Sequence, residues 1–132
     1  MLDNNIIPLP DGLISGSDID REAVKIAKEN LSNIPYGDKV KINLCDFKDI
    51  KALTDCTIVT NPPYGKRIGE KKSVEKLIKD FGDFLKNRCT NSKVFIYFGN
   101  RELIKHVGLK TSMKLPLKNG GLDGRLTKYE IY

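Results

Sequence analysis

The chain contains no tryptophan, one histidine, three cysteines and no long apolar run. No stretch approaches the roughly 18 apolar residues of a membrane-spanning helix, and the start, MLDNNIIPLP, lacks the basic region and apolar core of a signal peptide. Cys45, Cys56 and Cys89 lie far apart without a CxxC pair, which argues against a zinc site or a disulfide framework. We therefore expect reduced thiols, no metal, no membrane partner and a cytoplasmic protein.

The sequence does contain enough apolar material for one modest core. Its 132 residues are 39% hydrophobic, which suits a single globular domain and is too little for two. It shows no internal repeat, low-complexity tract or obvious linker. We predict one domain over residues 1–132.

Charge is distributed unevenly along the chain. Residues 1–60 carry seven basic and ten acidic side chains, a net charge of −3, whereas residues 61–132 carry sixteen and seven, a net charge of +9. A basic region is often only a solvated surface, and the lysines of residues 70–88 fit that reading. The excess nevertheless favours a polyanionic partner such as nucleic acid.

Short apolar runs alternate with helical periodicity, which predicts an α/β fold. Asp20 is a good N-cap for the first helix, and Asn100 for the last. The expected strands are residues 12–18, 39–44, 56–60 and 92–98, the expected helices are 21–31, 73–88 and 101–107, and residues 108–132 are expected to form two strands around a glycine-rich loop.

Ligands of open α/β sheets bind beyond the carboxyl ends of the strands, and two such ends carry an acid. Asp18 ends the first strand, where a carboxylate can accept hydrogen bonds from a ribose diol. Asp46 follows the second strand, where it could accept from an adenine amino group while Phe47 offers an apolar wall. The simpler interpretation is a turn acid at position 18, and a loop acid beside a core aromatic at positions 46 and 47.

A third strand end carries the stretch TNPPYGKR. Pro62 and Pro63 fix φ near −65° and lack N–H groups, so the turn is rigid and the carbonyl oxygens of Asn61 and Pro62 can point outward as acceptors. With the Asn61 side chain they can orient an exocyclic NH2 group toward an electrophilic methyl, while Tyr64 offers a stacking surface and Gly65 allows close approach. The alternative is an ordinary strand-to-loop turn.

Three further residues have weaker signals. Lys66 and Arg67 could contact phosphates near a target base, although solvated loop charges fit equally well. His106 stands alone beside Val107 and is expected to be structural.

The segments GSDIDREAVKIAKENL, CDF, TNPPYGKRIGE and KNGGLDGRLTKYEIY together resemble S-adenosylmethionine-dependent methyltransferases of the Rossmann-like class. Within that class they are similar to the catalytic domain of the THUMP-associated RNA guanine-N2 methyltransferases, over residues 13–132. The resemblance implies a partial Rossmann-like sheet, mostly parallel, with a C-terminal antiparallel hairpin. It also implies a THUMP domain in the full-length parent and 23S rRNA or tRNA as substrate.

The resemblance also implies a role for each motif residue. Asp18 and the adjacent Ile19 would bind the ribose end of S-adenosyl-L-methionine, Asp46 its adenine amino group, and Phe47 would line the adenine pocket. Asn61, which also borders the donor, would act with Pro62, Pro63 and Tyr64 to hold the flipped base. Tyr64, Gly65, Lys66 and Arg67 would contact the substrate.

The chain departs from the family in one respect. The family's core begins with a strand and a glycine-rich loop, whereas only the twelve residues MLDNNIIPLPDG precede LISGSD here. That strand would lie between those ending at Asp18 and Asn61, so the domain is expected to be truncated. We expect these two strands to pair directly, or residues 6–9 or a second chain to substitute, with self-association through the exposed sheet edge.

The resulting expectation is methylation of the exocyclic amino group of guanine in structured RNA, without a metal. Adenine-N6 methylation of DNA or RNA and glutamine amide methylation are alternatives, because each presents an NH2 group. A non-catalytic RNA-binding fragment is the alternative outside enzymes.

Overall fold

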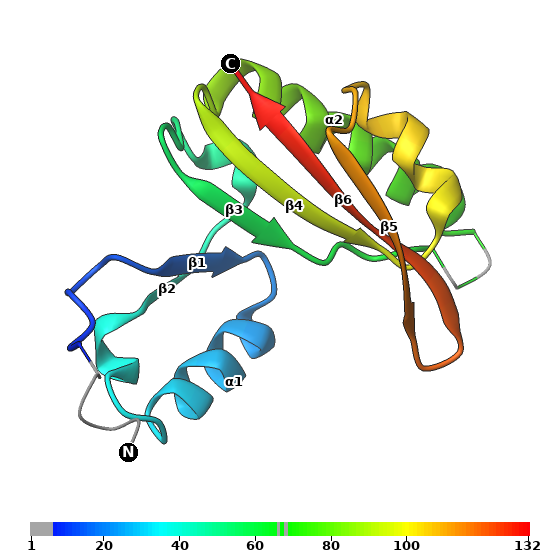
Figure 1. The fold of residues 1–132 in the computed structure, drawn as a ribbon. Coiled ribbons are helices and arrows are strands. Elements are labelled where there is room, and N and C mark those ends of the chain that lie inside the picture. The colour runs from blue at the N-terminus through cyan, green and yellow to red at the C-terminus, as the bar shows by residue number, and fades with distance from the viewer. Residues whose placement is uncertain (1–6, 66, 68) are drawn as a thin grey trace. The chain divides into compact units, whose positions relative to one another are not determined.

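The computed structural model describes residues 7–65, 67 and 69–132, and it divides the chain into two compact units, Met1–Ile50 and Lys51–Tyr132. Figure 1 shows the first unit in blue to cyan and the second in green to red. The first contains strands β1 (Ser15–Asp18) and β2 (Lys41–Leu44), helix α1 (Arg21–Leu31) and the 3-10 helices η2 (Gly37–Lys39) and η3 (Phe47–Asp49).

In the first unit, β1 and β2 form a parallel two-stranded sheet on which α1 packs. The helix begins after Asp20, whose side chain accepts a hydrogen bond from the Glu22 backbone N–H at 3.0 Å, so the predicted N-cap is confirmed. Val24 is the buried apolar residue of this helix. Leu13, Ile19 and Ile34 are 69%, 70% and 55% exposed, so the apolar side chains of this unit are largely uncovered.

The second unit is a four-stranded sheet in the order β3-β4-β6-β5. Its elements are β3 (Thr57–Thr60), α2 (Lys71–Arg88), β4 (Ser92–Phe98), the 3-10 helix η4 (Arg101–Val107), β5 (Met113–Asn119) and β6 (Leu122–Ile131). The pair β3 and β4 is parallel, and β6 runs antiparallel to both β4 and β5. The predicted C-terminal hairpin is therefore confirmed.

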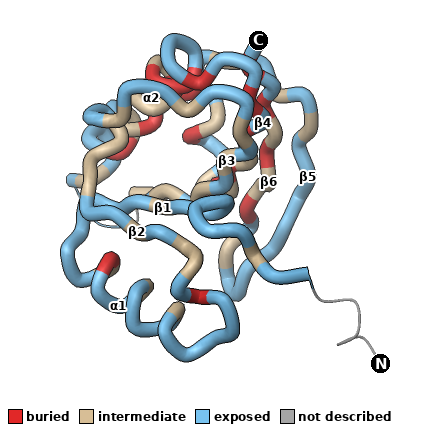
Figure 2. The backbone as a smooth tube through the Cα atoms, turned by 90° about the vertical axis from the view of Figure 1, so that its left-hand side faces the viewer, coloured by how far each residue is buried: buried red, intermediate tan, exposed pale blue. Residues whose placement is uncertain are grey.

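One face of this sheet carries the core. Alternate residues of β4, Val94, Ile96 and Phe98, are at most 1% exposed, and α2 and η4 lie on one side of the sheet. From α2, the apolar period brings Ile78 and Leu85 into the same core. Figure 2 shows the buried backbone concentrated in this unit.

The helix α2 and η4 approach closely because position 82 has no side chain. A Cβ atom on Gly82 would lie 2.0 Å from the Val107 carbonyl oxygen. The two elements therefore form one tightly packed layer over the sheet.

The other face of the sheet carries half-exposed apolar side chains. Phe95 and Tyr97 of β4 alternate with the core residues, and Lys128 lies over the Phe95 ring at 5.7 Å from its centroid. Val59 on the edge strand β3 is 77% exposed, and Leu115 on β5 is 48% exposed.

Two sequence predictions about the sheet are wrong. The strands ending at Asp18 and before Asn61 do not pair with each other, since β1 belongs to the two-stranded sheet and β3 to the four-stranded one. Residues 7–9 form no strand, and Ile6 lies outside the described residues. The physical reason is that each strand already has a hydrogen-bonding partner, β2 for β1 and β4 for β3. Among the described strands, one edge of β1 and one edge of β3 have no partner.

The helix expected at residues 101–107 is present as the 3-10 helix η4, with Asn100 as its N-cap. Its side chain accepts from the Glu102 backbone N–H at 3.0 Å. Within the part of the chain that the structure describes, no helix has both the length and the apolar character needed to cross a bilayer.

Candidate functional site

The first unit brings the two predicted strand-end acids to one edge of its sheet. Asp18 is paired with Leu44 in the parallel register, and the Cys45 backbone N–H donates to the Asp18 carbonyl oxygen at 2.9 Å. Asp46 follows one residue later. Because parallel strands end at the same edge, both carboxylates lie beyond the carboxyl ends of neighbouring strands.

Both acids also have local structural roles. Asp18 Oδ1 accepts from the Asp20 backbone N–H at 2.8 Å, and Asp46 Oδ1 accepts from the Lys48 backbone N–H at 3.0 Å as N-cap of η3. These bonds fix the direction of each carboxylate. Asp18 is exposed, whereas Asp46 and Phe47 are half-buried. The turn interpretation of Asp18 and the ligand interpretation are therefore compatible.

The exposed Ile19 follows Asp18 at the same strand end. An apolar side chain beside two oriented carboxylates suits the binding of a nucleoside. The carboxylates can accept hydrogen bonds from its hydroxyl and amino groups, and the apolar side chain can contact its base. The two carboxylates and the apolar side chain thus fit the ribose and adenine of a nucleoside cofactor. Within the described residues, no group of three or more His, Cys, Asp and Glu side chains is placed to hold a metal ion.

In the second unit, the NPPY turn directly follows β3. Because β3 and β4 are parallel, with Thr60 paired with Ile96, the turn emerges at the edge where β4 also ends. Asn61 and Pro63 are exposed and Pro62 is half-buried. The turn therefore lies at the carboxyl edge of the sheet, with Asn61 and Pro63 open to solvent.

The half-buried Tyr64 ring rests on the end of β4. A Cβ atom on Gly99 would lie 3.0 Å from Tyr64 Cδ1 and 3.3 Å from Leu122 Cδ1. Gly99 thus lets the ring of the turn and the first side chain of β6 converge on one spot. Sequence reasoning missed Gly99 and Leu122, although a glycine directly after the most apolar strand was the available signal.

Gly65 completes the turn with φ of +72°, in the left-handed region that glycine adopts readily. The next described basic residue, Arg67, is exposed and pairs with Glu70 at 3.6 Å. Lys66 lies outside the described residues, so its predicted substrate contact has no structural account.

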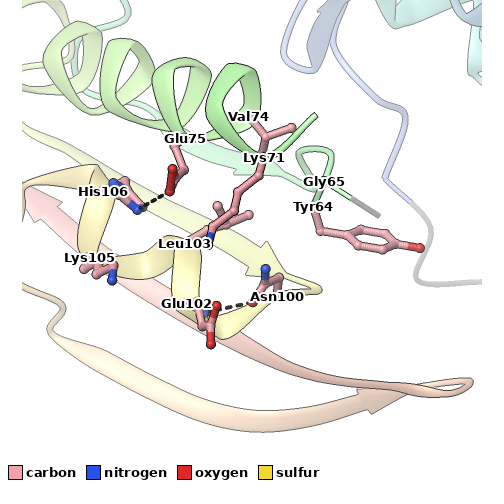
Figure 3. A pocket seen from close by; sticks show the side chains of 10 residues that line it. All are labelled: Tyr64, Gly65, Lys71, Val74, Glu75, Asn100, Glu102, Leu103, Lys105 and His106. Atoms are coloured by element: carbon pink, nitrogen blue, oxygen red, sulfur yellow. Dashed lines mark hydrogen bonds and ion pairs between the residues drawn. The ribbon is translucent and has the colours of Figure 1, made fainter. Parts of the chain in front are cut away.

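A cavity of about 170 Å³ adjoins the turn. Figure 3 shows it bordered by the start of α2 and by η4, with the Tyr64 ring pointing away from the Glu75 and His106 side chains. His106 Nε2 lies 3.1 Å from Glu75 Oε2, which joins η4 to α2. The lining residues are Tyr64, Gly65, Lys71, Val74, Glu75, Asn100, Glu102, Leu103, Lys105 and His106.

The sequence did not indicate that most of these polar residues line a cavity. Glu75 stands on the charged side of an amphipathic helix and looks like a solvated acid, and Lys71 and Lys105 look like ordinary surface cations. His106 was expected to be structural, and its pair with Glu75 agrees with that. The predicted site residues therefore form two sets, one at the sheet edge of each unit.

The sequence model of a family described as RMKL-like, methyltransferase domain, matches residues 3–128. The protein named "Putative RNA methyltransferase slr0064" of Synechocystis is 40% identical over 118 residues, and the "Ribosomal RNA large subunit methyltransferase K/L" of Syntrophotalea carbinolica is 32% identical over 121. The matches cover 89% and 88% of this chain but 31% and 17% of those proteins.

Solved structures agree with these relatives. A possible methylase from Clostridium difficile 630 superposes with a TM-score of 0.86 at 28% identity, covering 98% of this chain and 34% of that one. The structure described as "SMU.472, a putative methyltransferase complexed with SAH" gives a TM-score of 0.75 at 30% identity, covering 90% of this chain and 32% of that one. The predicted α/β methyltransferase fold is confirmed, and the chain belongs to the family of RMKL-like methyltransferase domains.

Proposed function

We propose that this chain is part of the catalytic domain of an RNA methyltransferase that modifies the exocyclic amino group of guanine. The observation that carries the proposal is the Asn61–Tyr64 turn at the carboxyl end of β3, with Tyr64 packed on Gly99. The family and the names of the two relatives support methyl transfer to RNA. The chain covers less than a third of each relative, so the longer protein would supply the remainder of the enzyme.

The first unit would hold the methyl donor, S-adenosyl-L-methionine, which supplies an electrophilic methyl on a sulfonium when bound. Asp18 would accept from the ribose hydroxyls beside Ile19, and Asp46 would accept from the adenine amino group beside Phe47. The hydrogen bonds that already fix both carboxylates would reduce the entropy lost on binding. The SAH complex of SMU.472 supports this donor.

The second unit would hold the acceptor. The Asn61 side chain and the Pro62 carbonyl oxygen would accept the two N–H bonds of the amino group, which directs the nitrogen lone pair toward the methyl. The rigidity that Pro63 adds would keep this geometry, and Tyr64 would stack on the base. Gly65, Lys66 and Arg67 would contact the neighbouring backbone.

Alignment would supply most of the rate enhancement, because the leaving group is already good. The amino nitrogen would gain its N–C bond as the donor's S–C bond breaks, and it would then carry a surplus proton. Asn61 and Pro62 would pass that proton to water after the transfer, since neither is a strong base. No metal takes part in this scheme.

The complete domain would need one more strand. The edges of β1 and β3 each lack a partner on one side among the described strands. A strand with a glycine-rich loop, from the longer protein or from a second chain by self-association, would join the two units into the single domain predicted for residues 1–132. We further propose a THUMP domain in the parent, 23S rRNA or tRNA as substrate, and the cytoplasm as location.

A second candidate is a non-catalytic RNA-binding fragment. The uncovered apolar side chains of the first unit favour it, because a donor site that is not supported by a packed core would bind weakly. Adenine-N6 methylation is an alternative outcome of the same acceptor geometry.

Calorimetric titration with S-adenosylhomocysteine tests the donor site, using the 132-residue chain beside a longer form that includes the upstream strand. Binding by the longer form supports the proposal, and binding by the short chain as well would show that it rebuilds the site. Absence of binding to both forms refutes it. Asp18→Asn, which keeps Oδ1 as acceptor for Asp20, should lower affinity about tenfold, as loss of one charge-assisted hydrogen bond predicts.

Methyl transfer to undermodified 23S rRNA and to tRNA, followed by nucleoside analysis, tests the acceptor. We expect N2-methylguanosine, and N6-methyladenosine instead would overturn the choice of base. Asn61→Ala should lower the rate by about 10²-fold or more without changing S-adenosylhomocysteine affinity by a similar factor. Equal loss of both would show a structural role only.

A further inference from the structure

Basic side chains from three elements of the second unit gather near the tip of the β5–β6 hairpin. Arg125 Nη1 donates to Asp123 Oδ1 at 3.0 Å and to the Gly124 carbonyl oxygen at 2.9 Å. Lys118 stands directly opposite Asp123 in the antiparallel register. With Arg101 at the start of η4, Lys118 and Arg125 form what we call the hairpin basic cluster.

All three basic side chains affect the same carboxylate, that of Asp123. The hydrogen bond from Arg125 and its charge lower the pKa of Asp123, and the charges of Arg101 and Lys118 lower it further. Asp123 is exposed to solvent. An anion at this surface would therefore meet positive potential from these side chains, while Asp123 holds the Arg125 guanidinium in place through the hydrogen bond at 3.0 Å.

The cluster adjoins the NPPY turn. Arg101 lies between Asn100 and Glu102, which border the same cavity as Tyr64. The first residue of β6, Leu122, converges with the Tyr64 ring on Gly99. Although Glu102 adds one negative charge, the basic side chains outnumber the acids here.

We propose that the hairpin basic cluster binds RNA phosphates on one side of the target nucleotide. The inference rests on the proposed function, because it takes Tyr64 as the place of the target base. Arg125 has five N–H donors in a rigid fork, and both hydrogen bonds described above come from Nη1 alone. Arg and Lys side chains fixed on separate elements can hold successive phosphates and set the register of the strand.

The hairpin tip would allow the backbone of RNA to approach. A Cβ atom on Gly120 or Gly121 would meet no other atom within 4 Å. Gly120 has a φ of +60°, which a glycine adopts readily in a tight turn. The turn is thus narrow and open, so its main-chain groups are accessible beside Lys118.

The outer surface of α2 provides a matched control. Lys76, Lys79 and Lys86 equal the cluster in number, and like Arg125 they have acidic partners, here Asp80 or Asp83 at 2.8, 3.1 and 3.9 Å. None of these lysines lines the cavity beside Tyr64, so replacing them changes net charge by the same amount at a surface that does not border that cavity. A loss that depends only on net charge would be equal for the two sets.

The test is fluorescence anisotropy of the 132-residue chain with a labelled RNA stem-loop that has guanine in its loop, at KCl concentrations from about 50 to 200 mM. We expect R101Q/K118Q/R125Q to bind about 10- to 100-fold more weakly and to lower the slope of log K against log salt by about 2, as loss of two to three phosphate contacts predicts. K76Q/K79Q/K86Q should change affinity less than about threefold.

Arg125 is partly buried, so a second variant keeps the test independent of folding. R101Q/K118Q changes two exposed side chains only and should lower the slope by about 1 to 2. Equal weakening by the α2 control, or no weakening by either cluster variant, would overturn the proposal. A duplex DNA of similar length is the second arm, and cluster-dependent binding to that DNA without cluster-dependent binding to RNA would overturn the choice of RNA.

Failure of this inference and failure of the proposed function give different results. RNA binding that depends on the cluster, with no S-adenosylhomocysteine binding by either the 132-residue chain or the longer form, would refute the methyltransferase function. It would still support the hairpin basic cluster as an RNA-binding surface. Donor binding and guanine methylation, together with unchanged RNA affinity in the cluster variants, would refute the surface alone.

Discussion

The two units of this chain differ in how they are stabilised. The first has a two-stranded sheet, one helix with Val24 as its buried apolar residue, and a net charge of −3 over residues 1–50. The second has a four-stranded sheet over a well-packed core and a net charge of +9 over residues 51–132. The unit that would bind the methyl donor is thus the less buried one, so its order depends on whatever covers its apolar side chains.

The first way to sharpen this comparison is amide hydrogen exchange on the full chain. We expect amides of β4 and the middle of α2 to exchange at least about 1,000-fold more slowly than those of α1, because opening α1 exposes little buried surface. This ratio corresponds to about 4 kcal/mol. Equal protection in α1 and β4 would show that the two units open together.

A longer form of the chain that includes the strand proposed to complete the domain is the informative control for that experiment. If the strand completes the first unit, α1 should gain protection while β4 changes little. Protection of α1 that does not respond to the strand would contradict the proposed completion.

Core truncation should break the second unit and spare the first. Leu85 is 0% exposed, so Leu85→Ala should lower the free energy of unfolding by about 3 kcal/mol, from the lost burial and the cavity left behind. Ile26 on α1 is 48% exposed, and Ile26→Ala should change the free energy of unfolding by less than about 1 kcal/mol. Urea unfolding monitored by circular dichroism measures both, and a larger effect at Ile26 would reverse the comparison.

The smallest expected effect is a pH dependence located in the second unit. Burial raises the pKa of Cys89 from 9.0 to about 11, so its thiol stays neutral in the folded chain where the unfolded chain would ionise. The resulting stability is present below pH 9.0 and is lost as the pH rises through about 11. We expect a decrease on the order of 1 kcal/mol across this window.

The variant Cys89→Ala tests the assignment, because it removes the titrating group. The free energy of unfolding of this variant should be lower than that of the parent chain at neutral pH. Between pH 9.0 and about 11 it should change less with pH than that of the parent chain. If the free energy of unfolding of the variant changes with pH as much as that of the parent chain, the pH dependence belongs to another group. Alkylation offers a second measurement, in which the buried Cys89 is compared with the half-buried Cys45 and Cys56.

Local elements were predictable from the sequence, and their assembly was not. Helix α1 has the predicted bounds because an Asp cap and an apolar period both act within a few residues, and β4 has them because the five consecutive residues from Val94 to Phe98 favour a strand. The separation into two sheets was missed because strand pairing depends on partners far along the sequence. The strand-end position of Asp18, Asp46 and Asn61 follows from the pattern, whereas Glu75 and Gly99 reach the site only through packing.

The contact between Gly82 and Val107 has a consequence for anyone who wishes to engineer the cavity. Two walls of the cavity beside Tyr64 are formed by α2 and η4, and the spacing of these two elements depends on one absent methyl group. A library that varies the lining residues can therefore explore shape and charge freely only while position 82 is held as glycine. A larger residue there would widen the gap between α2 and η4 and so shift all the lining residues that these two elements carry.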